Sequence, residues 1–125
     1  MAYYKFTSLI EQNKPIEIYN NGNHSRDFTY IDDIVDGVIK SLDKSYSYEI
    51  INLGNNKPTE LLYFIKLIEK QLGKKAKRKM LPMQAGDVEK TYADIKKAKK
   101  LLGFKPKIKI EKGIINFINW YNLYN

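Results

Sequence analysis

Apolar residues follow two spacings along the chain, one typical of helices and one typical of strands. Stripes three or four residues apart predict helices at 2–12, from 32 or 33 to about 42, and at 59–72, 94–102 and 111–124. Short apolar runs predict strands at 16–18, 28–31, 48–53 and near 78–81. Strands that alternate with helices indicate an α/β chain. We find no internal repeat or linker, so residues 1–125 are expected to form one domain.

Residues that commonly begin and end helices support these boundaries. Side chains able to accept backbone N–H bonds precede three of the helices, at Asp32 or Asp33, at Thr59 and at Asp94. Two helices are followed by a glycine suited to a left-handed end, Gly73 and Gly103. The helix that ends near residue 42 carries one apolar stripe, formed by Val35, Val38, Ile39 and Leu42. The run from Tyr48 to Leu53 shows little alternation, which is typical of a strand covered on both faces.

The composition fits a folded protein and excludes several kinds of chemistry. With 43% apolar and 13% aromatic residues, the chain does not have the composition of a disordered protein. It contains no cysteine, which excludes disulfides, thiolate metal sites and cysteine nucleophiles. Lys5, Glu11 and Lys14 interrupt the N-terminal apolar residues, unlike in a signal peptide, and no apolar run is long enough to span a bilayer. The sequence predicts a cytoplasmic protein.

The net charge of +8 raises the question of nucleic-acid binding. The basic residues gather in two runs, 74–79 and 96–100, which consist almost entirely of lysine. Neither run adjoins a helix-turn-helix, zinc or RNA-recognition signature. Solvated helix faces are therefore favoured, and a basic nucleic-acid-binding protein stays as an alternative.

The most distinctive segment is a loop rich in Asn and Gly that leads into Arg26. Arg26 is one of only two arginines, against twenty lysines. A guanidinium binds two phosphate or carboxylate oxygens at once, which a lysine cannot reproduce. The segment thus predicts a diphosphate or carboxylate ligand, with a surface ion pair as the alternative. His24, the only histidine, has no cluster of ligating residues beside it in the sequence and is assigned no role.

Six motifs occur in a fixed order along nearly the whole chain. They are Ile-Tyr-Asn-Asn-Gly at 18–22, Arg-Asp-Phe-Thr-Tyr-Ile-Asp-Asp at 26–33, Ile-Asn-Leu-Gly-Asn at 51–55, Leu-Pro-Met-Gln-Ala-Gly-Asp-Val at 81–88, Thr-Tyr-Ala-Asp at 91–94 and Gly-Phe-Lys-Pro at 103–106. This series resembles the C-terminal part of the NAD-dependent nucleotide-sugar epimerase/dehydratase family, the extended short-chain dehydrogenases. Within that family it looks most like UDP-glucuronate 4-epimerases. The resemblance implies an α/β substrate-binding portion, with short strands flanked by helices and without the N-terminal Rossmann cofactor half.

The resemblance implies a role in UDP-sugar binding for five residues. Arg26 matches the arginine that holds the UDP diphosphate, and Tyr19 an aromatic position near the uracil. Asp87 matches a carboxylate that binds the nucleoside, Gln84 stands where some relatives have a second phosphate-binding arginine, and Thr91 matches a position near the hexose. The residues alone leave other interpretations open. Tyr19 could be an ordinary strand residue, Asp87 a turn carboxylate and Thr91 a solvent-exposed hydroxyl.

Two features of the family are missing from the chain. It has no glycine-rich turn for NAD, and its one Tyr-x-x-x-Lys spacing, Tyr92 to Lys96, lies in the segment that matches the nucleotide-binding region. NAD is therefore expected to bind the parent enzyme and not this chain alone, which is expected to be inactive by itself. A non-catalytic nucleotide-sugar-binding or regulatory module is the alternative.

The resemblance also places the chain within a longer enzyme. Residues 1–6 match an internal run of the family, so the chain is expected to be a fragment of a larger epimerase: a truncated chain, one product of a split gene or a degraded reading frame. Strand edges that normally meet the cofactor half would then be exposed. A separate cofactor-binding half, or self-association, is the expected protein partner.

Overall fold

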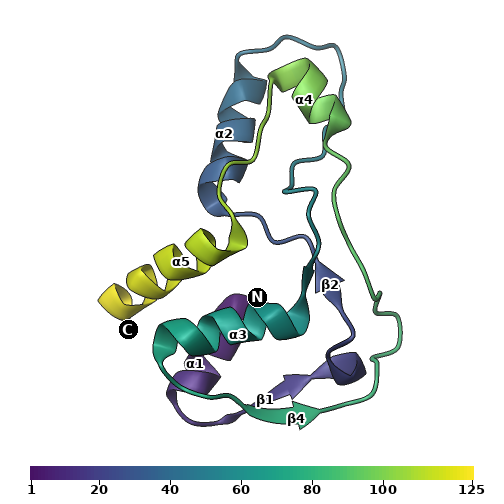
Figure 1. The fold of residues 1–125 in the computed structure, drawn as a ribbon. Coiled ribbons are helices and arrows are strands. Elements are labelled where there is room, and N and C mark those ends of the chain that lie inside the picture. The colour runs from purple at the N-terminus through teal and green to yellow at the C-terminus, as the bar shows by residue number, and fades with distance from the viewer.

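The computed structural model describes all residues, Met1–Asn125. Its α-helices are α1 (Ala2–Glu11), α2 (Ile31–Leu42), α3 (Leu61–Leu72), α4 (Lys96–Leu102) and α5 (Ile110–Tyr124). Its strands are β1 (Pro15–Ile18), β2 (Ser25–Arg26), β3 (Thr59–Glu60) and β4 (Lys77–Met80), and one 3-10 turn, η1, spans Tyr19–Gly22. Strands β1 and β4 pair in parallel (Figure 1). Strands β2 and β3 pair antiparallel. The α/β class predicted from the sequence is confirmed.

The larger hydrophobic cluster lies where α1, α3 and α5 meet β1. Its buried members are Phe6, Ile10, Ile16, Ile18, Phe64, Ile65, Ile68, Ile114 and Ile118. Phe64 lies at its centre, with its ring stacked on Phe28 at a centroid distance of 4.2 Å. The predicted apolar stripe of α3 supplies three of these residues, because positions 64, 65 and 68 fall on one helical face. This cluster anchors the β1–β4 pair from which the chain enters η1.

A second, smaller cluster lies around α4, beside α2 and apart from the first (Figure 1). Its buried members are Ile95, Ala98, Leu102 and Phe104, with Ile51 and Leu53 packed against them. Gly37 of α2 closes the cluster, since a side chain there would meet both Leu53 and Phe104 within about 3.1 Å. The segments that cross between the two clusters carry the residues of the candidate site.

All five helix predictions are confirmed to within two residues at each end. Helices α3 and α4 both end on a left-handed glycine, Gly73 with φ 65° and Gly103 with φ 64°. Asp36 and Lys40 form the expected pair one turn apart on α2, at 2.7 Å. The apolar stripe of α2 is present as predicted, but it faces solvent and not a core.

Two strand predictions are wrong. The predicted strand at 28–31 is absent: the pairing occurs earlier, at Ser25–Arg26, and Ile31 already begins α2. The predicted strand at 48–53 has an extended, apolar sequence, yet no other segment pairs with it. A strand needs a partner as well as a pattern, and only the pattern is visible in the sequence.

Two of the three predicted caps are also wrong. Thr59 does not cap α3, because it pairs in β3 with Arg26 of β2. Neither Asp32 nor Asp33 caps α2. Asp33 is buried and accepts hydrogen bonds from the backbone N–H groups of Lys107 and Ile108, at 3.0 and 2.9 Å, which fixes the approach to α5.

The third predicted cap, Asp94, does bond to the start of its helix. Asp94 accepts a hydrogen bond from the N–H of Lys96 in the first turn of α4, at 3.0 Å. None of the helices combines the length and the apolar character that crossing a bilayer requires.

Candidate functional site

The site is assembled by backbone pairing between β2 and a distant loop. The N–H of Ser25 donates to the carbonyl of Glu89 at 2.8 Å, and the N–H of Thr91 donates to the carbonyl of Ser25 at 3.1 Å. These two bonds lay residues 89–91 alongside β2. The loop that begins at Gln84 is thereby carried to Arg26.

Arg26 and Asp87 form an ion pair in this arrangement. The Nη2 atom of Arg26 lies 2.9 Å from Oδ1 of Asp87. The Nη1 atom donates to the carbonyls of Ser25 and Glu89, at 3.0 and 3.2 Å. The arginine and aspartate side chains are 28% and 31% exposed, so the guanidinium is held in place while part of it remains open to solvent.

His24 adjoins this pair, which the sequence did not predict. The residue is only 7% exposed, and its Nε2 atom lies 3.6 Å from Oδ2 of Asp87. No hydrogen bond reaches this buried nitrogen. His24 and Asp87 lie far apart in the sequence, and no local pattern links them, so only the folded chain shows that they are neighbours.

Asp27 holds together two loops next to the site, a role that the sequence did not predict. Its carboxylate accepts hydrogen bonds from three backbone N–H groups, those of Asn55, Asn56 and Ala93, at 3.2, 2.9 and 2.9 Å. The chain passes very close here, since a Cβ atom on Gly54 would lie 2.5 Å from that of Ala93. Asp27 thus ties the loop after residue 54 to the segment that carries Thr91.

A shallow hollow of about 170 Å³ lies beside these segments. Its lining residues are Asp27, Thr29, Leu53, Gly54, Thr91, Tyr92 and Ala93. Thr91 is exposed at its edge, next to the bond that joins it to Ser25. The hollow therefore lies next to Arg26 in the sequence, because Asp27, the residue that follows Arg26, lines it.

The five predicted site residues are not all brought together. The structure joins Arg26, Asp87 and Thr91 through the contacts above. Gln84 is exposed, and only its backbone carbonyl forms a hydrogen bond, accepting from the N–H of Asp87 at 3.2 Å. Tyr19 lies at the start of η1, where its hydroxyl donates to Glu17 at 3.3 Å. The negative charge of Glu17 raises the pKa of Tyr19 above its ordinary value.

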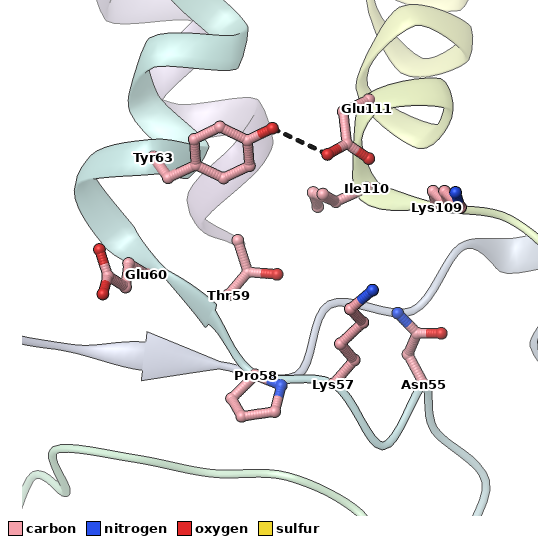
Figure 2. Close-up of a pocket in the computed structure, with 9 residues that line it drawn as sticks. All are labelled: Asn55, Lys57, Pro58, Thr59, Glu60, Tyr63, Lys109, Ile110 and Glu111. Atoms are coloured by element: carbon pink, nitrogen blue, oxygen red, sulfur yellow. Dashed lines mark hydrogen bonds between the residues drawn. The ribbon is translucent and has the colours of Figure 1, made fainter.

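A larger hollow of about 340 Å³ lies elsewhere, between the loop before α3 and the start of α5 (Figure 2). It contains none of the five predicted residues. The Tyr63 hydroxyl donates across it to Glu111 at 2.8 Å. The backbone N–H of Glu111 and then this hydroxyl hold the pKa of Glu111 below its ordinary value. The hydrogen bond also raises the pKa of Tyr63. Size alone does not make this hollow the candidate site, because neither Arg26 nor Asp87 lines it, and the Tyr63 hydroxyl and Glu111 are already bonded to each other.

The structure provides no cradle for a dinucleotide. The strand that runs directly into an α-helix is β3, which enters α3 at Glu60–Leu61. Both residues carry side chains, and no glycine-rich turn there lets a pyrophosphate approach. Tyr92 precedes α4 and Lys96 begins it, so the Tyr-x-x-x-Lys spacing does not place the two on one helical face. No group of three or more His, Asp or Glu side chains is arranged to hold a metal ion.

The basic run at 74–79 is partly engaged within the protein. Lys74 donates to the carbonyl of Glu11 at 2.8 Å, and Arg78 pairs with the buried carboxylate of Glu69 at 3.3 Å. The run at 96–100 covers α4, where Lys97 pairs with Glu49 at 3.2 Å. These contacts give several of the basic residues a structural role.

Comparisons with known proteins identify the family of the chain. The family model described as GDP-mannose 4,6 dehydratase matches residues 4–117. A UDP-glucuronate 4-epimerase of Thermodesulfobacterium geofontis is 49% identical over 121 residues, which are 96% of this chain and 37% of that enzyme. A probable UDP-glucuronate 4-epimerase of Rhizobium meliloti is 36% identical over 98% of this chain and 41% of the relative.

Solved structures show the same fold. The UDP-glucuronic acid 4-epimerase of Bacillus cereus, solved with UDP-glucuronic acid and NAD, matches the whole chain with a TM-score of 0.92 at 31% identity. This chain covers 40% of that one. It thus spans about two-fifths of the length of the relatives it matches, in agreement with the portion expected from its motifs. The chain belongs to the NAD-dependent nucleotide-sugar epimerase and dehydratase family.

Proposed function

We propose that this chain is the UDP-sugar-binding part of a nucleotide-sugar 4-epimerase that interconverts UDP-glucuronate and UDP-galacturonate. The observation that carries the proposal is the partly exposed guanidinium of Arg26, paired with Asp87 beside a hollow that Thr91 borders. An anchored arginine with free N–H groups suits a diphosphate, because its planar fork matches two phosphate oxygens. The similarity to enzymes solved with UDP-glucuronic acid and UDP-glucose supports the same ligand class.

The other predicted residues have proposed roles around this anchor. Asp87 binds the ribose hydroxyls, Thr91 lies near the hexose, and Tyr19 stacks on the uracil. Stacking on an aromatic ring contributes about 1–3 kcal/mol per base in nucleic-acid complexes. Gln84 carries no charge, so the grip on the diphosphate rests mainly on Arg26. A cytoplasmic location belongs to the same proposal.

The chemistry of the parent reaction requires residues that this chain does not contain. In such an epimerase, bound NAD would supply the hydride acceptor for oxidation of the sugar at C4. This chain offers neither a pyrophosphate cradle nor a Tyr and Lys on one helical face. The purified chain with NAD and UDP-glucuronate is expected to yield no UDP-galacturonate. Formation of that product, followed by chromatography, would contradict this expectation.

The binding role is tested by changing Arg26 to Lys and titrating the chain with UDP. Lysine keeps the charge but cannot form bidentate hydrogen bonds. A hydrogen bond to a charged group contributes about 1.5–3 kcal/mol. We expect UDP to bind roughly 10- to 100-fold more weakly to Arg26→Lys. Chemical-shift changes of the backbone amides, followed by NMR, report even weak binding and locate it.

The other arginine gives a matched control. Arg78 is similarly exposed, at 31%, and is also paired with a carboxylate, that of Glu69. Arg78→Lys should leave the UDP affinity unchanged. If both variants bind UDP as the unaltered chain does, or if the shifts cluster away from residues 24–27 and 84–91, Arg26 is not the diphosphate site.

A further inference from the structure

The His24 ring is a buried group at the candidate site to which UDP binding assigns no role. Its side chain is only 6% exposed, and its Nε2 atom forms no hydrogen bond within the protein. A buried polar atom without a partner is unfavourable, and the great majority of such atoms in folded proteins are paired. The unpaired nitrogen therefore points to a second state of the site in which it has a partner.

Asp87 offers the matching atom. Its Oδ1 accepts hydrogen bonds from Arg26 and from the backbone N–H of Val88, both at 2.9 Å. Its Oδ2 accepts none and lies 3.6 Å from Nε2 of His24. A charge-assisted N–H···O bond measures about 2.7–2.9 Å, so a shift of less than about 1 Å would form it. The preceding Gly86 gives the loop room to move, because no atom lies within 4 Å of the place where its Cβ would be.

Asp87 is also the only charged residue close enough to His24 for an ion pair. The N–H of Leu61 bonds to the carbonyl of His24, which places the first turn of α3 beside it, and this turn is uncharged, as is η1. Other charged residues on the segments around the ring are Arg26 of β2, Glu60 of β3, and Glu89 and Lys90 of the loop. The charge that a protonated His24 would meet is thus the carboxylate of Asp87.

The charge of the site depends on whether His24 carries a proton. The charges of Arg26 and Asp87 cancel, so a diphosphate meets a neutral pair while the imidazole is neutral. Protonation adds one positive charge and gives the Asp87 carboxylate a second cation to bind, which leaves more of the Arg26 charge to the diphosphate. Histidine is the side chain that ordinarily changes its charge between about pH 5 and pH 8.

We propose that His24 is a proton-dependent positioning residue for the UDP-sugar site. The neutral ring leaves Asp87 to Arg26. The protonated ring, with its proton taken from solvent, binds Oδ2 of Asp87 and strengthens the attraction between Arg26 and the diphosphate. The affinity for a UDP-sugar then rises as the pH falls through the titration of His24, and the gain is lost as the pH rises again. The proposal rests on the proposed function, since it concerns how the same site is regulated.

The affinity for UDP-glucose, measured by calorimetry at about pH 5.5 and pH 8, tests this regulation. The diphosphate of this ligand is esterified at both ends, so its own charge is constant over that range. We expect binding to be about 10-fold tighter at the lower pH. His24→Gln should bind equally at both pH values, with the affinity that the unaltered chain has at the higher one. Asn23→Gln, the control, changes an exposed neighbour and should keep the pH dependence.

NMR of the imidazole gives a second readout that needs no substitution, because His24 is the only histidine. Ligand binding and protonation are reciprocal. Saturating UDP-glucose should therefore raise the midpoint of the ring's titration by about one pH unit, which corresponds to the same factor of about 10. Asp87→Asn, without ligand, should lower the midpoint, since the ring loses its carboxylate partner.

The outcomes separate the two proposals. Equal UDP-glucose affinity at both pH values, or a midpoint that saturating ligand does not move, would overturn the role of His24 and leave the UDP site standing. An unchanged midpoint in Asp87→Asn would also overturn it, because His24 would then not pair with Asp87. A chain that binds no UDP-glucose at either pH, with no amide shifts around Arg26, would overturn both proposals.

Discussion

Replacing Asp33 by Asn is expected to lower the free energy of unfolding by about 3 kcal/mol. Its carboxylate is buried and accepts two backbone N–H bonds, from Lys107 and Ile108. An asparagine has the same shape but offers only one acceptor, so its NH₂ group would face a backbone N–H. The variant loses one charge-assisted bond and leaves a buried donor without a partner, and each of these losses costs about 1–3 kcal/mol. Urea unfolding followed by circular dichroism measures the change.

Asp32 is the matched control for this prediction. It precedes Asp33 directly in the first turn of α2, is exposed and forms no hydrogen bond to another segment. Asp32→Asn should cost less than about 1 kcal/mol, the size of a helix-dipole contribution. In Asp33→Asn, the amides of Lys107 and Ile108 should also exchange faster with solvent. Equal destabilisation by the two variants would mean that charge at the helix start, and not the tie to residues 107 and 108, is what matters.

Replacing Phe64 by Ala should have a still larger effect, a loss of about 3–5 kcal/mol. The ring is 1% exposed and lies between Phe28 and Phe6 in the larger cluster. Its removal leaves a cavity that the surrounding elements cannot fill, because α1, β1 and α5 supply the other residues of the same packed cluster. Urea unfolding measures the loss, as a lower transition midpoint with an unchanged m-value.

Tyr63 gives the comparison for Phe64 on the same helix. It is 42% exposed, and its hydroxyl donates a hydrogen bond to Glu111. Tyr63→Ala should cost about 1 kcal/mol, the net contribution of one hydrogen bond. If Phe64→Ala itself cannot be purified folded, Phe64→Leu should still be less stable than the unaltered chain. A loss below about 2 kcal/mol for Phe64→Ala would show that the larger cluster does not depend on this ring.

The helices could be predicted from the sequence because their signals are local. Apolar spacing and the end glycines Gly73 and Gly103 lie within a few residues of the boundaries that they set. The strands were harder to predict, because pairing joins distant segments. Nothing near residue 25 in the sequence shows that Ser25 bonds to Glu89 and Thr91, and nothing near residue 48 shows that its strand lacks a neighbour.

The candidate site follows the same rule. The chemistry of a guanidinium was enough to single out Arg26, since it depends on one residue. Its pairing with Asp87, the buried position of His24 and the three bonds of Asp27 all depend on contacts across the fold. Asp33 was misassigned for the opposite reason: a local role, capping, was available in the sequence, whereas its actual contacts lie more than seventy residues away.

The fixed position of Arg26 makes its binding of anions selective. Of the five N–H donors that a guanidinium carries, three are already engaged with the carbonyls of Ser25 and Glu89 and with Asp87. A flexible arginine would lose rotamer freedom on meeting an anion, whereas this one has lost it during folding. Its two remaining donors point from a rigid frame, so an anion must match their direction, and a poorly shaped competitor gains little from the charge alone.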